Sequence, residues 1–281
     1  LEIRSVTLKN RVVVAPMHQY SADRGQTTDW HLMNAGRYAA GGAGLVMMES
    51  TKVARNGCGT VGDTALWDDS FIPGFARCAT FIKQQGAVAA IQLGHSGRKA
   101  RLSRPWEGGK PLKGDEPEVY DWDGWELVAP SAIAHDDNSP VPRALSHNEV
   151  RDMVGKWGEA AERADKAGFD ILEIHGAHGY LIHQFLSPVA NQRTDMYGGN
   201  EMNRMRFAVE VAEHVRSIWP AEKPLFMRLS CEDDAGWGPE ESVRLSRLLR
   251  EKGVDVIDCS SGGTLKYSPM DGERSKKYGY Q

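Results

Sequence analysis

The sequence has few cysteines, no long apolar run and no excess of basic charge, and each shortage excludes a class of protein. Only four of its 281 residues are cysteines and none forms a CxxC pair, so we expect reduced thiols in a cytoplasmic protein. No apolar run reaches the roughly 20 residues of a membrane-spanning helix. A net charge of −4 gives no electrostatic case for binding nucleic acid or an anionic membrane.

Short apolar runs alternate with longer segments of helical periodicity. The runs contain Val, Ile, Leu and Met without polar alternation, which is typical of parallel strands covered on both faces. The six predicted strands are residues 11–17, 44–50, 88–93, 170–174, 224–229 and 254–259. Helices are predicted at residues 30–40, 70–85, 200–219 and 239–252, and between Ser146, which begins a capping box with Glu149, and Gly168.

This alternation predicts a single domain over residues 1–281 with the TIM (β/α)8 barrel fold. A doubly wound open sheet is the alternative, but the GxGxxG pattern typical of its first strand–helix turn is missing. A closed barrel needs eight strands, and residues 264–281 are polar without a strand pattern. A barrel with two strands missing would expose two sheet edges, so it is not a plausible complete fold. We therefore expect that the last two strands of the barrel are absent from this chain. The sequence also starts without Met, so we expect the domain to be incomplete at both ends.

The fourth predicted strand is followed by His175, His178 and Tyr180. In a barrel, chemistry takes place where the strands end, and two imidazoles with a phenol can bind a substrate oxygen and deliver a proton there. A metal site is the alternative for the histidines. Only His183 is a further ligand nearby, and no Cys or Glu completes a set, so we predict no metal.

The other strand ends also carry polar or aromatic side chains. They supply the remaining candidate site residues, which are His18, Tyr20, Ser50, Gln92 and Arg228. Arg228 taken alone could equally be a structural arginine in a salt bridge. Residues 97–125 form a long, charged connection after the third strand, and we expect them to make a partly ordered loop on the substrate side.

Taken in order, these segments resemble the Old Yellow Enzyme family of NADH:flavin oxidoreductases, and within it the YqjM-like branch of bacterial ene-reductases. The resemblance extends from Leu8 to about Gln281. The motifs that carry it are Lys9-Asn10-Arg11, Ala15-Pro16-Met17, Gln92-Leu93-Gly94-His95-Ser96-Gly97-Arg98, Ala129-Pro130-Ser131, Glu173-Ile174-His175-Gly176-Ala177-His178-Gly179-Tyr180-Leu181, Gln184-Phe185-Leu186-Ser187-Pro188, Asn191-Gln192-Arg193-Thr194-Asp195 and Tyr197-Gly198-Gly199.

The resemblance implies an FMN site. Gln92 would hydrogen-bond the pyrimidine edge of the flavin, and Arg228 would face its N1–C2 carbonyl side, where a cation stabilises the reduced ring. The residues that would line the flavin are Pro16, Met17, His18 and Ser50.

The resemblance also implies the substrate groups. His175 and His178 would hold the carbonyl oxygen, Tyr180 would donate the proton, and Tyr20 would form part of the pocket wall. The implied enzyme is a homo-oligomeric ene-reductase that moves hydride from NADPH or NADH through FMN to the C=C bond of small α,β-unsaturated carbonyl compounds.

Two alternatives stay open. The chain could be the reductase domain of a larger redox enzyme acting on aromatic- or enoyl-CoA thioesters, in which residues 97–125 would serve a bulky substrate. It could also be a non-catalytic barrel that binds flavin.

Two departures from the family pattern bear on these expectations. His18 stands where the YqjM-like branch usually has a flavin-contacting Cys, so we expect an altered flavin potential or a narrower pocket. The strands that carry the phosphate grip of the family are the two that we expect to be absent.

Overall fold

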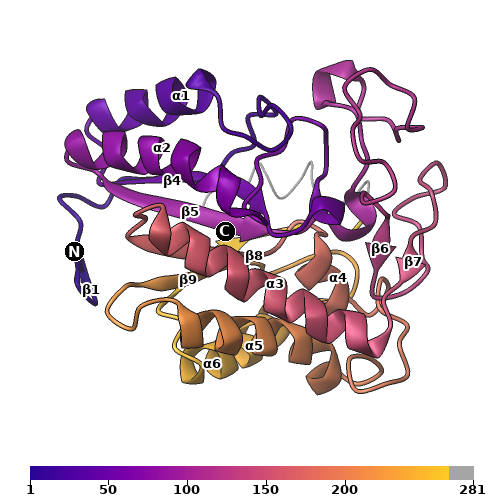
Figure 1. The fold of residues 1–281 in the computed structure, drawn as a ribbon. Coiled ribbons are helices and arrows are strands. Elements are labelled where there is room, and N and C mark those ends of the chain that lie inside the picture. The colour runs from indigo at the N-terminus through magenta and orange to yellow at the C-terminus, as the bar shows by residue number, and fades with distance from the viewer. Residues whose placement is uncertain (266–281) are drawn as a thin grey trace.

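The computed structural model describes residues 1–265, and within them a six-stranded sheet forms the centre of the fold (Figure 1). Its strand order is β10-β9-β8-β5-β4-β3, and every neighbouring pair is parallel. The strands are β3 (Val13–Val14), β4 (Leu45–Lys52), β5 (Val88–Gly94), β8 (Ile171–Gly176), β9 (Leu225–Ser230) and β10 (Val256–Ser260). The prediction about residues 264–281 falls, from residue 266 on, outside the described part.

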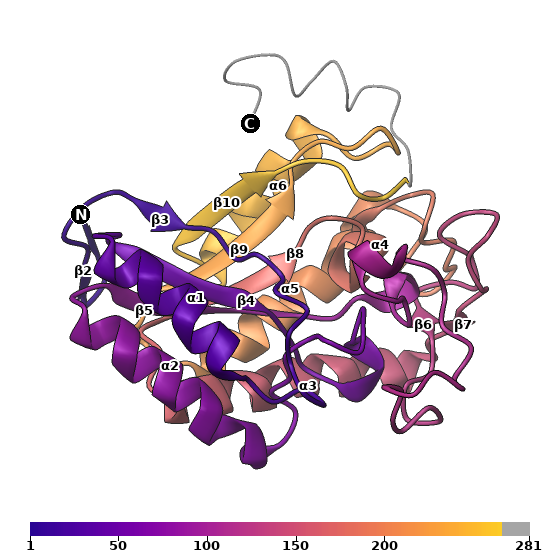
Figure 2. The same ribbon diagram turned by 90° about the horizontal axis from the view of Figure 1, so that it is seen from above.

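The six predicted strands are all present, but the first is much shorter than expected. A strand over residues 11–17 was predicted, whereas β3 is two residues long and pairs only with β4. No described strand pairs with the other edge of β3, so no further backbone hydrogen bonds lengthen it. Viewed from above, the sheet is curled so that its edge strands β3 and β10 lie on the same side of the molecule (Figure 2).

Helices follow the strands and cover the outer face of the sheet (Figure 1). Ser146 accepts a hydrogen bond from the Glu149 N–H and begins α3, as the capping box predicts. The short helix α4 directly after β8 was not predicted. The helices are α1 (Asp29–Ala40), α2 (Ile72–Gln84), α3 (His147–Lys166), α4 (Leu181–Leu186), α5 (Glu201–Ile218) and α6 (Pro239–Glu251).

Smaller elements complete the described chain. Strands β1 (Glu2–Ile3) and β2 (Val6–Thr7) form an antiparallel hairpin, and β6 (Val128–Ala129) pairs with β7 (Arg143–Ala144). The 3₁₀ turns are η1 (Arg55–Gly57), η2 (Asp69–Phe71), η3 (Gly97–Lys99) and η4 (Pro105–Glu107). The last two lie in the loop of residues 97–125, which is therefore partly ordered. No helix within residues 1–265 combines the length and apolar character needed to cross a membrane.

Alternation along each strand separates two cores. On β4, Val46 and Met48 face the helices, whereas Leu45 and Met47 face the inside of the curl. The inner apolar layer is small, and Ile3 and Val6 of the hairpin pack against it. Its buried members are Leu8, Leu45, Met47, Ala90, Ile171 and Phe226.

Toward the C-terminal strand ends, the inward positions become polar. Two residues beyond Ala90 comes Gln92, which is level with Glu173 on β8. Arg228 on β9 is level with both His175 and Asp258. We call Gln92, Glu173, Arg228 and Asp258 the polar layer. This layer lies above the apolar one and beneath the strand ends, where the sequence predicts the site.

Candidate active site

The structure brings together His175, His178 and Tyr180. The His175 ring lies 5.1 Å from that of His178 and 5.0 Å from that of Tyr180, centroid to centroid, and both contacts are edge-on. His175 is the inward residue near the end of β8 and is 3% exposed. The predicted cluster of two imidazoles and a phenol is therefore present at this strand end.

The turn after β8 positions these rings through backbone that few residues adopt. His178 has a φ of 59°, in the left-handed region that costs energy for residues other than glycine. Hydrogen bonds hold this conformation. The His178 N–H donates to Ser230 Oγ at 2.9 Å, and the Ser230 hydroxyl donates to the Gly262 carbonyl. Gly179 must be glycine, because a Cβ there would lie 2.0 Å from the Gly263 oxygen.

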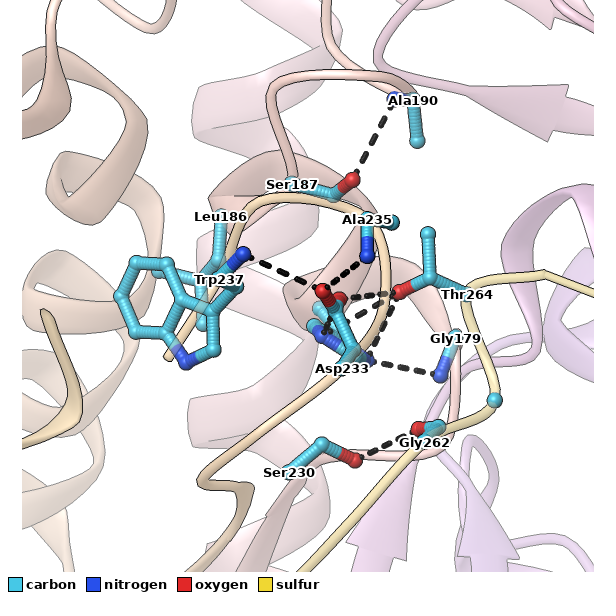
Figure 3. Close-up of polar contacts among 12 residues, drawn as sticks. Gly179, Leu186, Ser187, Ala190, Ser230, Asp233, Ala235, Trp237, Gly262 and Thr264 are labelled. Carbon is cyan, nitrogen blue, oxygen red and sulfur yellow. Dashed lines mark hydrogen bonds and ion pairs between the residues drawn. The ribbon is translucent and has the colours of Figure 1, made fainter. Parts of the chain in front are cut away.

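A buried network around Asp233 supports the same turn (Figure 3). The Gly179 N–H donates to His183 Nδ1, so His183 carries its proton on Nε2, 2.9 Å from Asp233 Oδ2. Thr264 Oγ1 donates to the same carboxylate oxygen, and the N–H groups of Ala235 and Trp237 donate to the other. His183, the further ligand considered for a metal, is engaged in this network. Within residues 1–265, no group of three or more His, Cys, Asp or Glu side chains could hold a metal ion.

The protonation states suit proton transfer to a carbonyl substrate. Burial, followed by the nearby His178, holds the pKa of His175 well below its ordinary value, and burial followed by the Arg228 charge lowers the pKa of His178 to about 3. Both rings are therefore neutral near pH 7. His175 Nδ1 accepts from the Ala177 N–H, which leaves its proton on Nε2. Burial raises the pKa of Tyr180, so the phenol keeps its proton until a stronger base is present.

The predicted pocket wall is also close. The His18 ring stacks on Tyr20 at 5.4 Å and meets Tyr180 edge-on at 6.2 Å. Tyr20 in turn contacts Trp106, and its carbonyl accepts from Arg104 Nε at 3.0 Å. Trp106 and Arg104 belong to residues 97–125, so this loop lies beside the site as expected.

The polar layer links the two residues predicted to hold the flavin ring. Gln92 Nε2 donates to Glu173 Oε2 at 2.6 Å, and Arg228 Nε lies 3.4 Å from Asp258 Oδ2. Glu173 is fully buried, and its Oε1 has no hydrogen-bond donor. Burial and the adjacent Asp258 raise the pKa of Glu173 to about 8, so its carboxyl group is protonated near pH 7. Arg228 is thus both in an ion pair and inside the site.

Sequence reasoning missed four ionisable residues of this region. Glu173, Asp258, Lys52 and Lys99 all lie around the rings and the polar layer. The signal was available, because Glu173 lies two residues before His175 and Lys52 two after Ser50, and residues two apart on a strand share a face. Asp258 likewise lies two residues before Ser260, whose Oγ is 2.6 Å from His178 Nε2.

The residues present fit the ring system of a flavin. The Gln92 amide and the Arg228 guanidinium supply donors for the polar edge of an isoalloxazine, and neutral His175 and His178 supply donors beside it. Gly94 leaves room, since a Cβ there would lie 2.5 Å from Ser50 Oγ and 3.3 Å from His175 Cβ. Pro16 is half-buried and Met17 is 47% exposed after β3. The family's phosphate grip is not among the described residues.

Comparison with known proteins identifies the family. The profile of the NADH:flavin oxidoreductase / NADH oxidase family matches residues 1–275. The chain belongs to this family. An NADPH dehydrogenase of Bacillus cytotoxicus is 42% identical over 267 residues, which is 94% of this chain and 70% of that protein.

Solved structures agree with this assignment. A 2-naphthoyl-CoA reductase matches with a TM-score of 0.84 at 26% identity, over 97% of this chain but only 42% of that one. An old yellow enzyme homologue from Zymomonas mobilis matches with a TM-score of 0.77 at 26% identity, over 97% of this chain and 77% of that one. The predictions of an α/β barrel and of an FMN- and NAD(P)H-dependent oxidoreductase family are confirmed.

Proposed function

We propose that this chain forms the ring-binding part of an ene-reductase, which passes hydride from NADPH or NADH by way of FMN to the C=C bond of an α,β-unsaturated carbonyl compound. The observation that carries the proposal is the grouping of neutral His175, neutral His178 and protonated Tyr180 above a polar layer that contains Gln92 and Arg228. We further propose that the protein is cytoplasmic, that it is a homo-oligomer and that this chain forms one barrel domain.

Gln92 and Arg228 would hold the ring of FMN, and FMN would supply the two-electron chemistry that links the nicotinamide to the alkene. His175 donates from Nε2 to the substrate carbonyl oxygen. His178 Nε2 lies 2.6 Å from Ser260 Oγ, so Nδ1 is the nitrogen of His178 that is left to donate to the same oxygen. These hydrogen bonds strengthen as negative charge develops on that oxygen, so they stabilise the transition state more than the ground state.

Tyr180 supplies the proton that balances the hydride. Hydride addition at the β-carbon leaves an enolate, and the phenol O–H protonates the α-carbon, which gives the saturated carbonyl compound and a phenolate. The ammonium groups of Lys52 and Lys99 lie 5.3 Å and 5.2 Å from the Tyr180 ring centroid and favour the phenolate until solvent returns a proton.

An anaerobic colour assay tests the proposal. Purified protein should be yellow, NADPH should bleach it, and cyclohexenone should restore the colour. Tyr180→Phe should still be bleached but should be recoloured much more slowly, because only the second step needs the phenol. Protein that binds flavin but is not bleached would favour the non-catalytic barrel.

A second candidate is reduction of aromatic- or enoyl-CoA thioesters. The likeness to a 2-naphthoyl-CoA reductase favours it, as does the ordered loop of residues 97–125 beside the pocket wall. Recolouring rates with cyclohexenone and with 2-naphthoyl-CoA, measured on the same bleached protein, separate the two. A faster reaction with the thioester would make it the substrate class.

A further inference from the structure

Lys52, the last residue of β4, is a fully buried cation next to the proposed active site. Lysines are almost never fully buried unless they are paired. Its Nζ lies 3.2 Å from Ser50 Oγ, 3.0 Å from His18 Nε2 and 3.5 Å from Asp63 Oδ2. The ammonium therefore has two hydrogen-bond partners and one ion-pair partner, and one of the hydrogen-bond partners is a ring nitrogen of His18.

Asp63 supplies the opposite charge. It is 2% exposed, and it accepts hydrogen bonds from the Gly59 N–H at 2.7 Å and from Thr60 Oγ1 at 2.8 Å. Burial alone would raise its pKa, but the Lys52 charge and these hydrogen bonds lower it. The carboxylate therefore stays ionised and balances the ammonium inside the protein.

The contact with Lys52 determines which nitrogen of His18 carries the proton. An ammonium group has only donors, so His18 Nε2 at 3.0 Å must accept. In a neutral imidazole the other nitrogen then carries the proton. We propose that Lys52 is a positioning residue that holds His18 as the neutral Nδ1–H tautomer. Burial and then the Lys52 charge lower the pKa of His18 to about 4, which agrees with a neutral ring.

The surroundings of His18 give this tautomer its importance. The groups that face the ring are the charges of Lys52, Asp63 and Lys99 and the rings of Tyr20, Tyr180 and His175. With Nε2 engaged, His18 offers the site one donor, Nδ1–H, and no positive charge. The inference rests on the proposed function for its catalytic meaning, since His18 is a residue expected to line the flavin.

Nitrogen NMR on protein labelled with ¹⁵N-histidine tests the proposal directly, with His18→Asn to assign the signals by their loss. Wild-type His18 should show a pyrrole-type Nδ1 and a pyridine-type Nε2, unchanged between about pH 6 and pH 8. A protonated Nε2 in the wild type overturns the proposal. This readout does not depend on turnover, so it stands or fails separately from the ene-reductase assignment.

The variant to compare is Lys52→Met combined with Asp63→Asn, which removes both buried charges together and leaves neither unpaired. His18 should then populate both tautomers, because no ammonium occupies Nε2. Burial, the largest cause of its lowered pKa, should still keep the ring neutral near pH 7. Asp63→Asn alone keeps Lys52 and should keep the wild-type tautomer. If the double variant retains the wild-type nitrogen signals, with Nδ1 protonated and Nε2 not, Lys52 does not position His18. If it fails to fold, the wild-type spectrum alone decides.

Discussion

The outer and inner faces of the sheet bury residues of opposite kinds. The outer face packs apolar side chains against helices, and Phe75 and Trp157 are completely buried there. The inner face is apolar only near the N-terminal strand ends and then buries Glu173, His175 and Lys52. The outer core supplies hydrophobic stabilisation, whereas the upper inner face holds polar groups whose burial is unfavourable in itself. Substitutions on the two faces should therefore separate stability from activity.

The largest expected effect is on activity, from the inner face. Tyr180→Phe removes one hydroxyl and no packing volume, so turnover of an enone should fall by roughly 10²- to 10⁴-fold, the range for loss of a general acid. The urea midpoint should stay that of the wild type. Stopped-flow absorbance resolves the two half-reactions. A fall confined to NADPH oxidation would contradict the assigned role.

Trp157→Ala, on the outer face, should have the opposite effect and lower stability without lowering activity. Trp157 is completely buried between α3 and its neighbours and stacks edge-on with Phe207 at 5.8 Å. Its truncation should lower the free energy of unfolding by about 3–5 kcal/mol, as for large aromatic residues in cores. Urea denaturation measures this loss. Turnover per folded molecule should be unchanged, and a selective loss of activity would show that the two faces are coupled.

The pH dependence of stability should differ in sign between an inner and an outer glutamate. The pKa of Glu173 is raised to about 8 in the folded protein, against about 4.3 unfolded. Between about pH 4.3 and pH 8 the folded state holds a proton that the unfolded state has lost. The contribution of this group to the free energy of unfolding is therefore complete below about pH 4.3. It is lost as the pH rises to about 8, by at most about 1.4 kcal/mol per pH unit. Glu173→Gln should weaken this dependence in urea titrations at a series of pH values, and the raised pKa of the neighbouring Asp258 should leave part of it.

Glu149 is the matched outer residue. Its bonds to Arg143 and to Ser146 lower its pKa to about 2, so its contribution is present above about pH 4.3 and is lost as pH falls toward 2. Glu149→Gln should therefore lower the free energy of unfolding in neutral solution, whereas in strong acid the variant and the wild type should be equally stable. If the free energy of unfolding depended on pH in the same way in Glu173→Gln and Glu149→Gln, burial would not determine the sign of that dependence.

Ser146→Ala is expected to have the smallest effect. It removes the side chain that caps the N-terminus of α3 on the outside of the molecule. The expected loss is about 1 kcal/mol of unfolding free energy, visible as a small shift of the urea midpoint. Flavin binding, followed by absorbance, should be unaffected, because the hydrogen bond that is lost is exposed at the end of α3.

The sequence predicted the elements well and their ends less well. The apolar runs correspond to β4, β5, β8, β9 and β10 to within two residues at each end, since a short apolar run is a local property. It failed for β3, whose length depends on having a neighbour on each side, and for α4, whose six residues are too few to show a period.

The sequence by itself determined the order of strands and helices, the alternation that turns every second strand residue inward, and the presence of His175, His178 and Tyr180 at one strand end. Only the tertiary structure decided the partners. Gln92 meets Glu173 across 81 positions because the register of β5 and β8 brings them level. Lys52, at the end of β4, meets His18, in the segment after β3, across 34 positions. Local patterns indicate which way a side chain faces, but its charge state depends on neighbours that are close only after the sheet has curled.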